Sequence, residues 1–462
     1  MTDLPFVAGD DSEIALVLVT DASFDAWKQD ATPAHKSWVE AHDFKPESAR
    51  HLILPGEDGA PASVLVGYDP DAPLWTFASL PLGLPDGAYT ISLAGEERLT
   101  PVQANQLCIG WAMGAYQFTE FKSGGREPAR LVLPETADAK TVEITATAIK
   151  RCRDLVNRPA SHLTPEQLAE EAITLAKAHK AKSSVIVGDK LLSKGYPAIH
   201  AVGRAADQPP RLVDVTWGDA KHPHLTIIGK GVTFDTGGLD LKPAQWMENM
   251  KKDMGGAAHA IALAGMVMAA GLPVRLRLLL PIVENAVSAN AMRPMDIIDT
   301  RAGKTVEVMN TDAEGRLILS DALAEAASEE PDLILDYATL TGAARVAMGA
   351  DVVPFFTHSD AVANALMDAS TRLQDPCWRL PLHDGYKDEV KSEIADLKNL
   401  PNGPFGGAIT AALFLNEFVP PHLHWVHFDT YAWNQSKRPG RPKGGEAMSI
   451  RASFEMLRRR YP

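Results

Sequence analysis

Residues 225–238 of the chain read LTIIGKGVTFDTGG, and this stretch decides the fold. A short, near-continuously apolar run, residues 225–228, leads directly into a glycine-rich segment that carries Lys230 and Asp235. A run without polar alternation is typical of a strand that is buried on both faces of a parallel sheet. We therefore expect a buried strand, followed at once by a turn whose side chains lie at the carboxyl end of that strand.

The same pattern of apolar strands separated by helices continues through the C-terminal two thirds of the chain. Further candidate strands are residues 276–283, 306–309, 333–337 and 425–428. Candidate helices are residues 245–270, 314–327 and 406–418. This alternation predicts an α/β fold with a mixed, mostly parallel sheet that helices cover on both faces. In such sheets active sites lie beyond the carboxyl ends of strands.

The first part of the chain has a different pattern. Residues 1–140 alternate short apolar runs, such as 15–19 and 63–66, with turn-rich pieces, which predicts a smaller α/β domain. A helical pattern over residues 141–156 and a capping-box sequence at 164–167 predict a linker of helices. The predicted divisions are residues 1–140, 141–170 and 171–462.

Composition excludes several classes of protein. The 462 residues include 45 Lys and Arg against 59 Asp and Glu, a net charge of −14, which argues against binding to nucleic acid. A chain of this length buries a core without disulfides. The three cysteines form no Cys-x-x-Cys pair, which favours a reducing compartment; they are Cys108, Cys152 and Cys377.

Two features of the sequence bear on location. Residues 1–5 lack the basic region of a secretory signal, so we expect no export by that route. The longest apolar stretch, residues 260–272, is shorter than the roughly 20 residues that span a bilayer. We therefore interpret it as a core helix and expect a cytoplasmic protein without a membrane anchor.

Acidic side chains occur in three segments that could carry chemistry. In residues 229–238, Lys230 and Asp235 lie among four glycines, which fits either a glycine-rich turn with an ion pair or a backbone that approaches a ligand closely. In the predicted helix 245–270, Asp253 lies near the apolar stripe. A carboxylate there is costly unless it is paired, for instance with Lys252, or bound to metal.

The third segment, residues 310–317, reads NTDAEGRL. Thr311 and Glu314 fit a capping box, which would make them purely structural. That interpretation gives no role to Asp312 or Arg316. Two carboxylates two residues apart can instead converge on divalent cations, and an arginine near a helix start can hold an anion.

Taken together, the three segments supply an oxygen-rich set of side chains: Asp235, Asp253, Asp312 and Glu314. No His-Glu-x-x-His or Gly-x-Ser-x-Gly motif competes with this set. We interpret the histidines near strand starts and turns as structural, among them His422 and His427.

These segments resemble the leucine aminopeptidase (cytosol aminopeptidase) family. The resemblance covers the chain from about residue 150 to near its end, and residues 310–317 match the family's signature octapeptide throughout. The other matching segments are residues 229–242, 252–258, 283–290 and 336–343. The resemblance implies that residues 171–462 form a two-metal exopeptidase domain. Residues 1–140, the family's variable part, would serve regulation or oligomerisation.

The resemblance also implies a role for each matching residue. Asp235 and Glu314 would bridge both metals. Lys230 and Asp253 would complete one metal site, and Asp312 the other. Two further residues would act on the reaction itself: Lys242 by stabilising the oxyanion, and Arg316 by holding a bicarbonate ion that acts as general base.

A further set of matches implies the pocket for the first side chain of the substrate. Met250, Thr339 and Gly342 would line it, and Leu340 would give a backbone contact. We expect a flexible thioether wall to accept leucine and methionine and to reject aspartate and glutamate, whose charge would lack a partner. Residues 443–448, KGGEAM, depart from the family's usual Thr-Gly pair and affect the far wall of this pocket.

The resemblance implies peptide substrates, two divalent metal ions per subunit and a homohexamer. The ions would be Zn or Mn, with Co or Mg as further candidates. Two alternatives stay open at the sequence level. A two-metal phosphohydrolase would use the same acids but needs more basic residues, and a binding protein would use the fold for regulation or DNA contact. The acidic balance and the intact ligand set weigh against the last.

Overall fold

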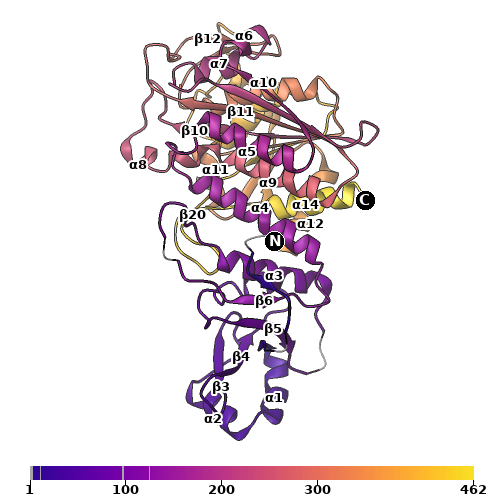
Figure 1. The fold of residues 1–462 in the computed structure, drawn as a ribbon. Helices are drawn as coiled ribbons and strands as arrows, with labels where there is room; N and C mark the ends of the chain where they lie inside the picture. Colours follow the sequence, from indigo (N-terminus) through magenta and orange to yellow (C-terminus); the bar gives the residue numbers. More distant parts are fainter. Residues whose placement is uncertain (1–3, 11, 96–97, 124) are drawn as a thin grey trace. The chain divides into compact units, whose positions relative to one another are not determined.

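The computed structural model describes residues 4–10, 12–95, 98–123 and 125–462 (Figure 1). The first three residues of the chain, where the sequence shows no basic secretory region, lie outside these ranges. By internal contacts the chain divides into two units. Residues 1–150 and 436–443 form the first unit, and residues 151–435 and 444–462 form the second.

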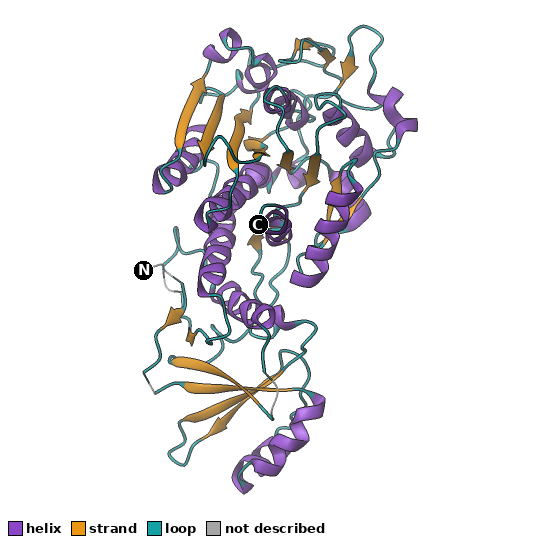
Figure 2. Cartoon of the chain, turned by 90° about the vertical axis from the view of Figure 1, so that its right-hand side faces the viewer, coloured by secondary structure: helices purple, strands orange, loops and turns teal. Residues whose placement is uncertain are grey.

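The first unit contains a six-stranded sheet in the order β1-β6-β5-β2-β4-β3 (Figure 2). All neighbours in this sheet are parallel except β3 and β4. In chain order the strands are β1 (Phe6–Val7), β2 (Ile14–Val19), β3 (His51–Pro55), β4 (Pro61–Gly67), β5 (Ala88–Leu93) and β6 (Arg130–Val132). The apolar runs predicted at residues 15–19 and 63–66 are therefore adjacent central strands.

Helices pack beside this sheet. Phe24 of α1 and Val39 of α2 share a core with Val19, Leu54 and Leu65 of the strands. The helical elements are α1 (Asp21–Asp30), α2 (Pro33–Ala41), the 3₁₀ turn η1 (Pro73–Trp75) and α3 (Pro101–Ala115). Helix α3 begins after Thr100, with the Thr100 and Gln103 capping box formed.

The second unit is built on a nine-stranded, mixed sheet. Its order is β16-β15-β18-β14-β9-β11-β8-β7, and β10 pairs with β11. The pairs along the centre, from β18 through β14 and β9 to β11, are parallel. The strands are β7 (Lys182–Val187), β8 (Arg211–Trp217), β9 (His224–Gly229), β10 (Gly231–Asp235), β11 (Arg275–Asn285), β14 (Leu333–Ala338), β15 (Val353–Phe356), β16 (Cys377–Arg379) and β18 (Trp425–Asp429).

Helices cover both faces of this sheet (Figure 1). Ile228 of β9 belongs to a core that includes residues of α7 and α10. The next residue, Gly229, faces the opposite side of the sheet. A Cβ atom added at Gly229 would lie 2.6 Å from the Cα atom of Ala257 in α9. Only glycine allows α9 to approach β9 so closely. The predicted α/β fold with helices on both faces is confirmed.

The remaining helices belong mostly to this unit. They are α4 (Ala139–Asn157), which contains the point of division, α5 (Pro165–Ala178), α6 (Lys190–Ser193), α7 (Pro197–Gly203), α8 (Ala244–Met247), α9 (Gly255–Ala270), α10 (Gly315–Ala327), α11 (Gly342–Met348), α12 (Asp360–Leu373), α13 (Gly407–Asn416) and α14 (Ile450–Arg460). Two 3₁₀ turns are η2 (Met250–Met254) and η3 (Asp384–Val390).

Two predicted elements differ from the structure. The helix predicted over residues 245–270 is broken into α8, η2 and α9. Gly255 and Gly256 are poor helix formers and start α9 afresh after the tighter 3₁₀ turn. The strand predicted over residues 306–309 is β13 (Thr305–Glu307), which lies outside the main sheet. It pairs with β12 (Ile297–Asp299) and β17 (Leu397–Lys398), while β19 (Trp433–Asn434) and β20 (Gly444–Gly445) form a separate pair.

One segment, Met250–Ala270, is long and apolar enough to cross a membrane by length and composition. However, 89% of its most apolar window is buried inside the protein, as a core helix would be. The three cysteines are also buried, and none is in a disulfide.

Candidate active site

Lys230 is held at the carboxyl end of β9 with its ammonium inside the protein. Its side chain is only 3% exposed. The Nζ atom lies 2.7 Å from Oδ2 of Asp253 and 2.9 Å from Oε1 of Glu314, and it donates a hydrogen bond to the Thr339 carbonyl. The Lys230–Asp235 ion pair considered from the sequence is not formed. Through its contacts with Asp253 and Glu314, Lys230 instead links η2 to the start of α10.

Lys242 forms the second cationic contact of the site. Its Nζ atom lies 2.9 Å from Oδ2 of Asp235, at the end of β10, and it also pairs with Asp312. Lys242 is 12% exposed, so its ammonium faces the acids but retains access to the cavity described below.

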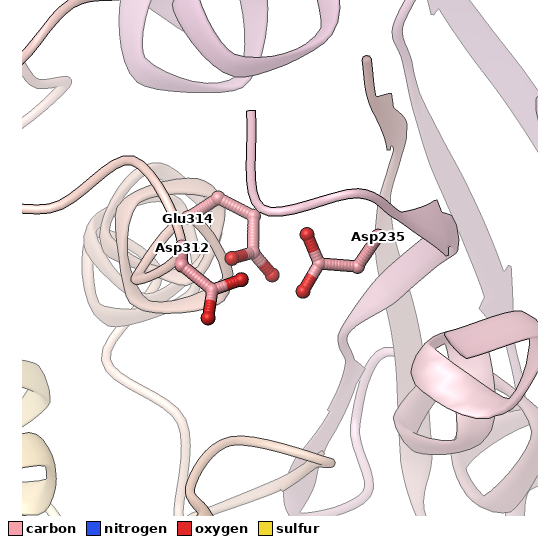
Figure 3. Close-up of side chains that lie close together, drawn as sticks. All are labelled: Asp235, Asp312 and Glu314. Carbon is pink, nitrogen blue, oxygen red and sulfur yellow. The ribbon is translucent and has the colours of Figure 1, made fainter. Parts of the chain in front are cut away.

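Three of the four predicted acids converge on one point. Asp235, Asp312 and Glu314 each offer an oxygen, and these oxygens all lie within 4.8 Å of one another. Figure 3 shows the three carboxylates turned toward a common centre, Asp235 from a strand and the other two from the segment that leads into α10. Asp253, the fourth acid, joins them through its contact with Lys230.

The capping box predicted for Thr311 and Glu314 is not formed. Helix α10 begins at Gly315 with Glu314 as its N-cap residue, and no side chain makes a capping hydrogen bond. The Thr311 hydroxyl instead donates to the Gly237 carbonyl at 2.5 Å and accepts a hydrogen bond from the Asp240 amide. Both side chains are therefore used to build the site rather than to cap the helix.

Asn285, at the end of β11, positions the acids, although sequence reasoning gave it no role of its own. Its Nδ2 atom donates to Oδ1 of Asp235 at 2.8 Å and to the Thr311 carbonyl at 3.1 Å. One amide thus ties the strand that carries Asp235 to the loop that carries Asp312. The signals in the sequence were its place just after a predicted strand and within the matching segment 283–290.

The burial and the charges of the clustered acids favour the binding of cations. Burial, reinforced by the charge of Asp235, raises the pKa of Glu314 to about 8 and that of Asp312 to about 6. Burial opposes the charge of Lys230, but Asp253 and Glu314 outweigh it and raise the lysine pKa. Crowded carboxylates that resist ionisation in this way are relieved by divalent cations, so the donor set fits metal ions.

Arg316 is placed to hold an anion. Its Nη1 atom donates to the Asn399 carbonyl at 2.7 Å. Within the described residues its buried Nε atom has no hydrogen-bond partner. Burial lowers the pKa of Arg316 to about 10, so the guanidinium is still charged at neutral pH. A buried donor without an acceptor fits a small anion such as bicarbonate.

A cavity of about 260 Å³ opens beside the acids. It is lined by all four residues predicted to contact the substrate, Met250, Thr339, Leu340 and Gly342, and by Met448 of the departing segment 443–448. Sequence reasoning missed several other lining residues, including Trp246, Lys252, Arg345 and Tyr431. Except for Lys252, which begins the matching segment 252–258, they lie outside the matching segments.

A fold of this kind, with acids and lysines gathered at strand ends, belongs to metal-dependent hydrolases. Residues 150–453 match the cytosol aminopeptidase family, catalytic domain, and residues 14–134 match the M17 aminopeptidase, N-terminal domain. The chain belongs to the cytosol aminopeptidase family, and it is an aminopeptidase-type hydrolase.

Individual relatives agree with this assignment. The structure of the cytosol aminopeptidase from Coxiella burnetii is 43% identical, with a TM-score of 0.95 over 99% of both chains. The bottromycin maturation enzyme BotP, solved in complex with Mn, is 30% identical, with a TM-score of 0.87 over 98% of this chain and 100% of its own. A probable cytosol aminopeptidase of Syntrophotalea carbinolica is 39% identical over 77% of this chain and 75% of its own.

Proposed function

We propose that this protein removes the N-terminal residue from peptides, with leucine and other mainly apolar residues as its preferred first residues. The observation that carries the proposal is the convergence of Asp235, Asp312 and Glu314 within 4.8 Å, beside two lysines and a cavity. Two divalent cations, Zn or Mn with Co or Mg as further candidates, would activate a water molecule and polarise the scissile carbonyl when bound.

Five residues of the chain would bind the two cations. Asp235 and Glu314 lie centrally and would contact both cations. Asp253 would serve one cation together with Lys230, whose amine must then be neutral. Asp312 would serve the other cation. Lys230 already contacts two of these acids. When the acids bind cations instead, the lysine side chain can remain in the site.

Lys242 and Arg316 would act on the reacting groups. The Lys242 ammonium reaches both the acids and the cavity, so it can donate to the oxygen that becomes negative during attack on the carbonyl. Arg316, whose buried Nε atom has no hydrogen-bond partner among the described residues, would hold bicarbonate, and this ion would supply the general base. Leu340 would orient the substrate through its backbone, beside the wall that Met250, Thr339 and Gly342 form.

One comparison tests the proposal against the phosphohydrolase alternative. The Mn²⁺-loaded protein is assayed with a leucyl anilide and with an aryl phosphate. We expect hydrolysis of the anilide alone, and at least about a 100-fold loss of it in Asp235→Asn, because that carboxylate would contact both cations. Hydrolysis of the phosphate alone would refute the proposal.

We further propose a homohexamer in the cytoplasm, without a membrane anchor and without nucleic acid as a partner. The proposal rests on family membership and on the net charge of −14, which repels nucleic acid. Light scattering at micromolar concentration should give about six times the mass of one chain. A monomeric mass would contradict the hexamer but would leave the proposed activity intact.

A further inference from the structure

Two cations line the substrate cavity without forming an ion pair to any described residue. Lys252 lies on η2 and is 6% exposed, and Arg345 lies on α11 and is half-buried. Within the described parts of the chain, neither has a carboxylate oxygen within 4.0 Å of its charged nitrogens, and neither side chain makes a hydrogen bond. A buried cation in that position is costly.

Both cations lie against the same aromatic ring. The Lys252 ammonium is 5.2 Å from the centre of the Tyr431 ring, and the Arg345 guanidinium is 4.9 Å from it. The Arg345 guanidinium is also 5.8 Å from the Trp246 ring. These contacts offset part of the cost of burial. They do not remove the repulsion between two like charges that share one ring.

The neighbouring acids are already engaged. Asp253 meets Lys230 at 2.7 Å and accepts a hydrogen bond from Thr339. Asp429 accepts hydrogen bonds from the amides of Leu340 and Thr341 at the start of α11. Asp253 therefore acts on Lys252 only through its charge, without an ion pair. No acid of the described cavity wall forms an ion pair with Lys252 or Arg345, and an anion from outside can do so.

Their position ties the two cations to the first residue of the substrate. Lys252 follows Met250 by two residues on the same short turn. Arg345 follows Gly342 by three residues on α11, which places both on one face of that helix. Met250 and Gly342 are the residues proposed to contact the first side chain, and both cations line the same cavity.

We propose that Lys252 and Arg345 recognise a carboxylate on the first residue of the substrate, so that the enzyme also removes N-terminal glutamate and aspartate. This inference rests on the proposed function. It replaces the expectation that acidic residues are rejected, which assumed a pocket without a partner for their charge. The two cations supply that partner.

The test compares glutamyl and glutaminyl anilides, which differ in charge but hardly in size, and uses leucyl anilide as a reference. In the Mn²⁺-loaded full chain we expect glutamyl anilide to be hydrolysed. The ratio of its kcat/KM to that of glutaminyl anilide should fall by at least about 10-fold in Arg345→Gln and in Lys252→Met. Arg345→Lys should restore most of the ratio, and Arg345→Glu should shift preference toward lysyl anilide.

Lys251→Met is the matched control. Lys251 neighbours Lys252 in sequence, but its ammonium donates to the Asn157 carbonyl at 2.6 Å and does not line the cavity. The glutamyl-to-glutaminyl ratio should stay at the wild-type value in this variant. Melting temperatures of all variants identify any that fail to fold. If Lys252→Met is one of them, the three Arg345 exchanges still test the inference.

The outcomes are distinct. If leucyl anilide itself is not hydrolysed, the proposed function fails. If leucyl anilide is hydrolysed but the glutamyl-to-glutaminyl ratio is the same in wild type, Arg345→Gln and Lys252→Met, the inference alone is overturned. It is also overturned if the variants change only the ratio between the dipeptides Leu-Glu and Leu-Gln, because the recognised carboxylate would then be on the second residue.

Discussion

The sequence is compatible with two roles for Glu314, helix capping and metal binding. Its surroundings in the structure distinguish between the two roles. It is the N-cap residue of α10, but its side chain makes no capping hydrogen bond. It points instead to Asp235 and Asp312, and burial raises its pKa to about 8. An ionised carboxylate with such a pKa does not stabilise the fold by itself.

We therefore expect Glu314→Gln to lower turnover by at least about 100-fold with little change in the free energy of unfolding. A capping role predicts the reverse, a stability loss of about 1 kcal/mol with nearly normal turnover. Turnover of leucyl anilide and the denaturant midpoint, measured on the same variant, decide between them. Asp388→Asn, in an exposed ion pair with Lys391 at 2.7 Å outside the cavity, is the control and should change neither quantity much.

Met250 also fits two roles, either as a wall of the substrate pocket or as part of the hydrophobic core. It is half-buried on η2 and lines the cavity together with Thr339. We expect Met250→Ala to favour bulkier aromatic first residues, because the shorter side chain leaves room for them, with only a modest loss of stability. A panel of amino-acid anilides and a melting curve measure both effects. An unchanged substrate ranking together with a loss of about 2 to 5 kcal/mol would instead identify Met250 as ordinary core.

The pairing of the lysines marks the limit of sequence reasoning at this scale. The motif around residues 229–238 predicts that Lys230 and Asp235 lie near a strand end, but the nearest acid in sequence is not the partner. Lys230 meets Asp253 and Glu314, and Lys242 takes Asp235. Partners of this kind depend on which strands become neighbours, and a local motif does not contain that information.

Among the elements, the strands of the main sheet were the easiest to predict. Their apolar runs have no polar alternation, so residues 225–228, 276–283, 333–337 and 425–428 all lie within its central strands. The run at 306–309 is interrupted by Glu307 and pairs in a small separate sheet, because partner choice is non-local. The predicted helix 245–270 has the right periodicity, yet η2 interrupts it where Lys252 and Asp253 are buried at the site.

The pair of adjacent strands β14 and β18 supports a prediction about pH. His427 of β18 is fully buried, with its Nδ1 atom 2.6 Å from Asp336 of β14. Burial lowers the pKa of His427, but Asp336 raises it more, so the net shift is upward. A histidine whose folded-state pKa lies above about 6.5 stabilises the fold fully below that pH, and the contribution is lost as the pH rises through the folded-state pKa.

We expect His427→Asn to lower the melting temperature more at about pH 6 than at about pH 9, because the protonated imidazole gains more from Asp336 than the neutral one does. Thermal unfolding of wild type and variant at both pH values measures the difference. His422→Asn is the matched control, since His422 is 61% exposed in its pair with Glu330 and should have little effect at either pH. An equal loss at both pH values would show that the protonated pair contributes nothing to stability.

For the whole molecule, the sequence predicts the arrangement of the second unit better than that of the first. The motifs of the second unit recur at strand ends, and parallel strands bring their carboxyl ends to one edge. In the first unit the runs at 15–19 and 63–66 do become neighbouring strands, but no motif gathers chemical groups there. The cavity wall was predicted in part, because the four residues expected to contact the substrate do line it, whereas Trp246, Lys252, Arg345 and Tyr431 were not expected there.

The charge of the whole site leads to a prediction about metal removal. Asp235, Asp253, Asp312 and Glu314 meet only two lysines, Lys230 and Lys242, in the ion pairs of the site. Those pairs hold the acids together in the absence of metal, so a chelated protein should stay folded. No serine or cysteine nucleophile motif offers another route to hydrolysis.

We therefore expect prolonged chelation to abolish hydrolysis of leucyl anilide while the circular dichroism spectrum stays that of the folded protein. Added Mn²⁺, Zn²⁺ or Co²⁺ should restore activity, because carboxylate and amine ligands accept all three ions. Metal analysis before and after chelation should give about two ions per chain and then nearly none. Full activity in a protein shown to be free of metal would rule out the two-metal site, whereas unfolding on chelation would show that the lysine pairs alone do not hold the acids in place.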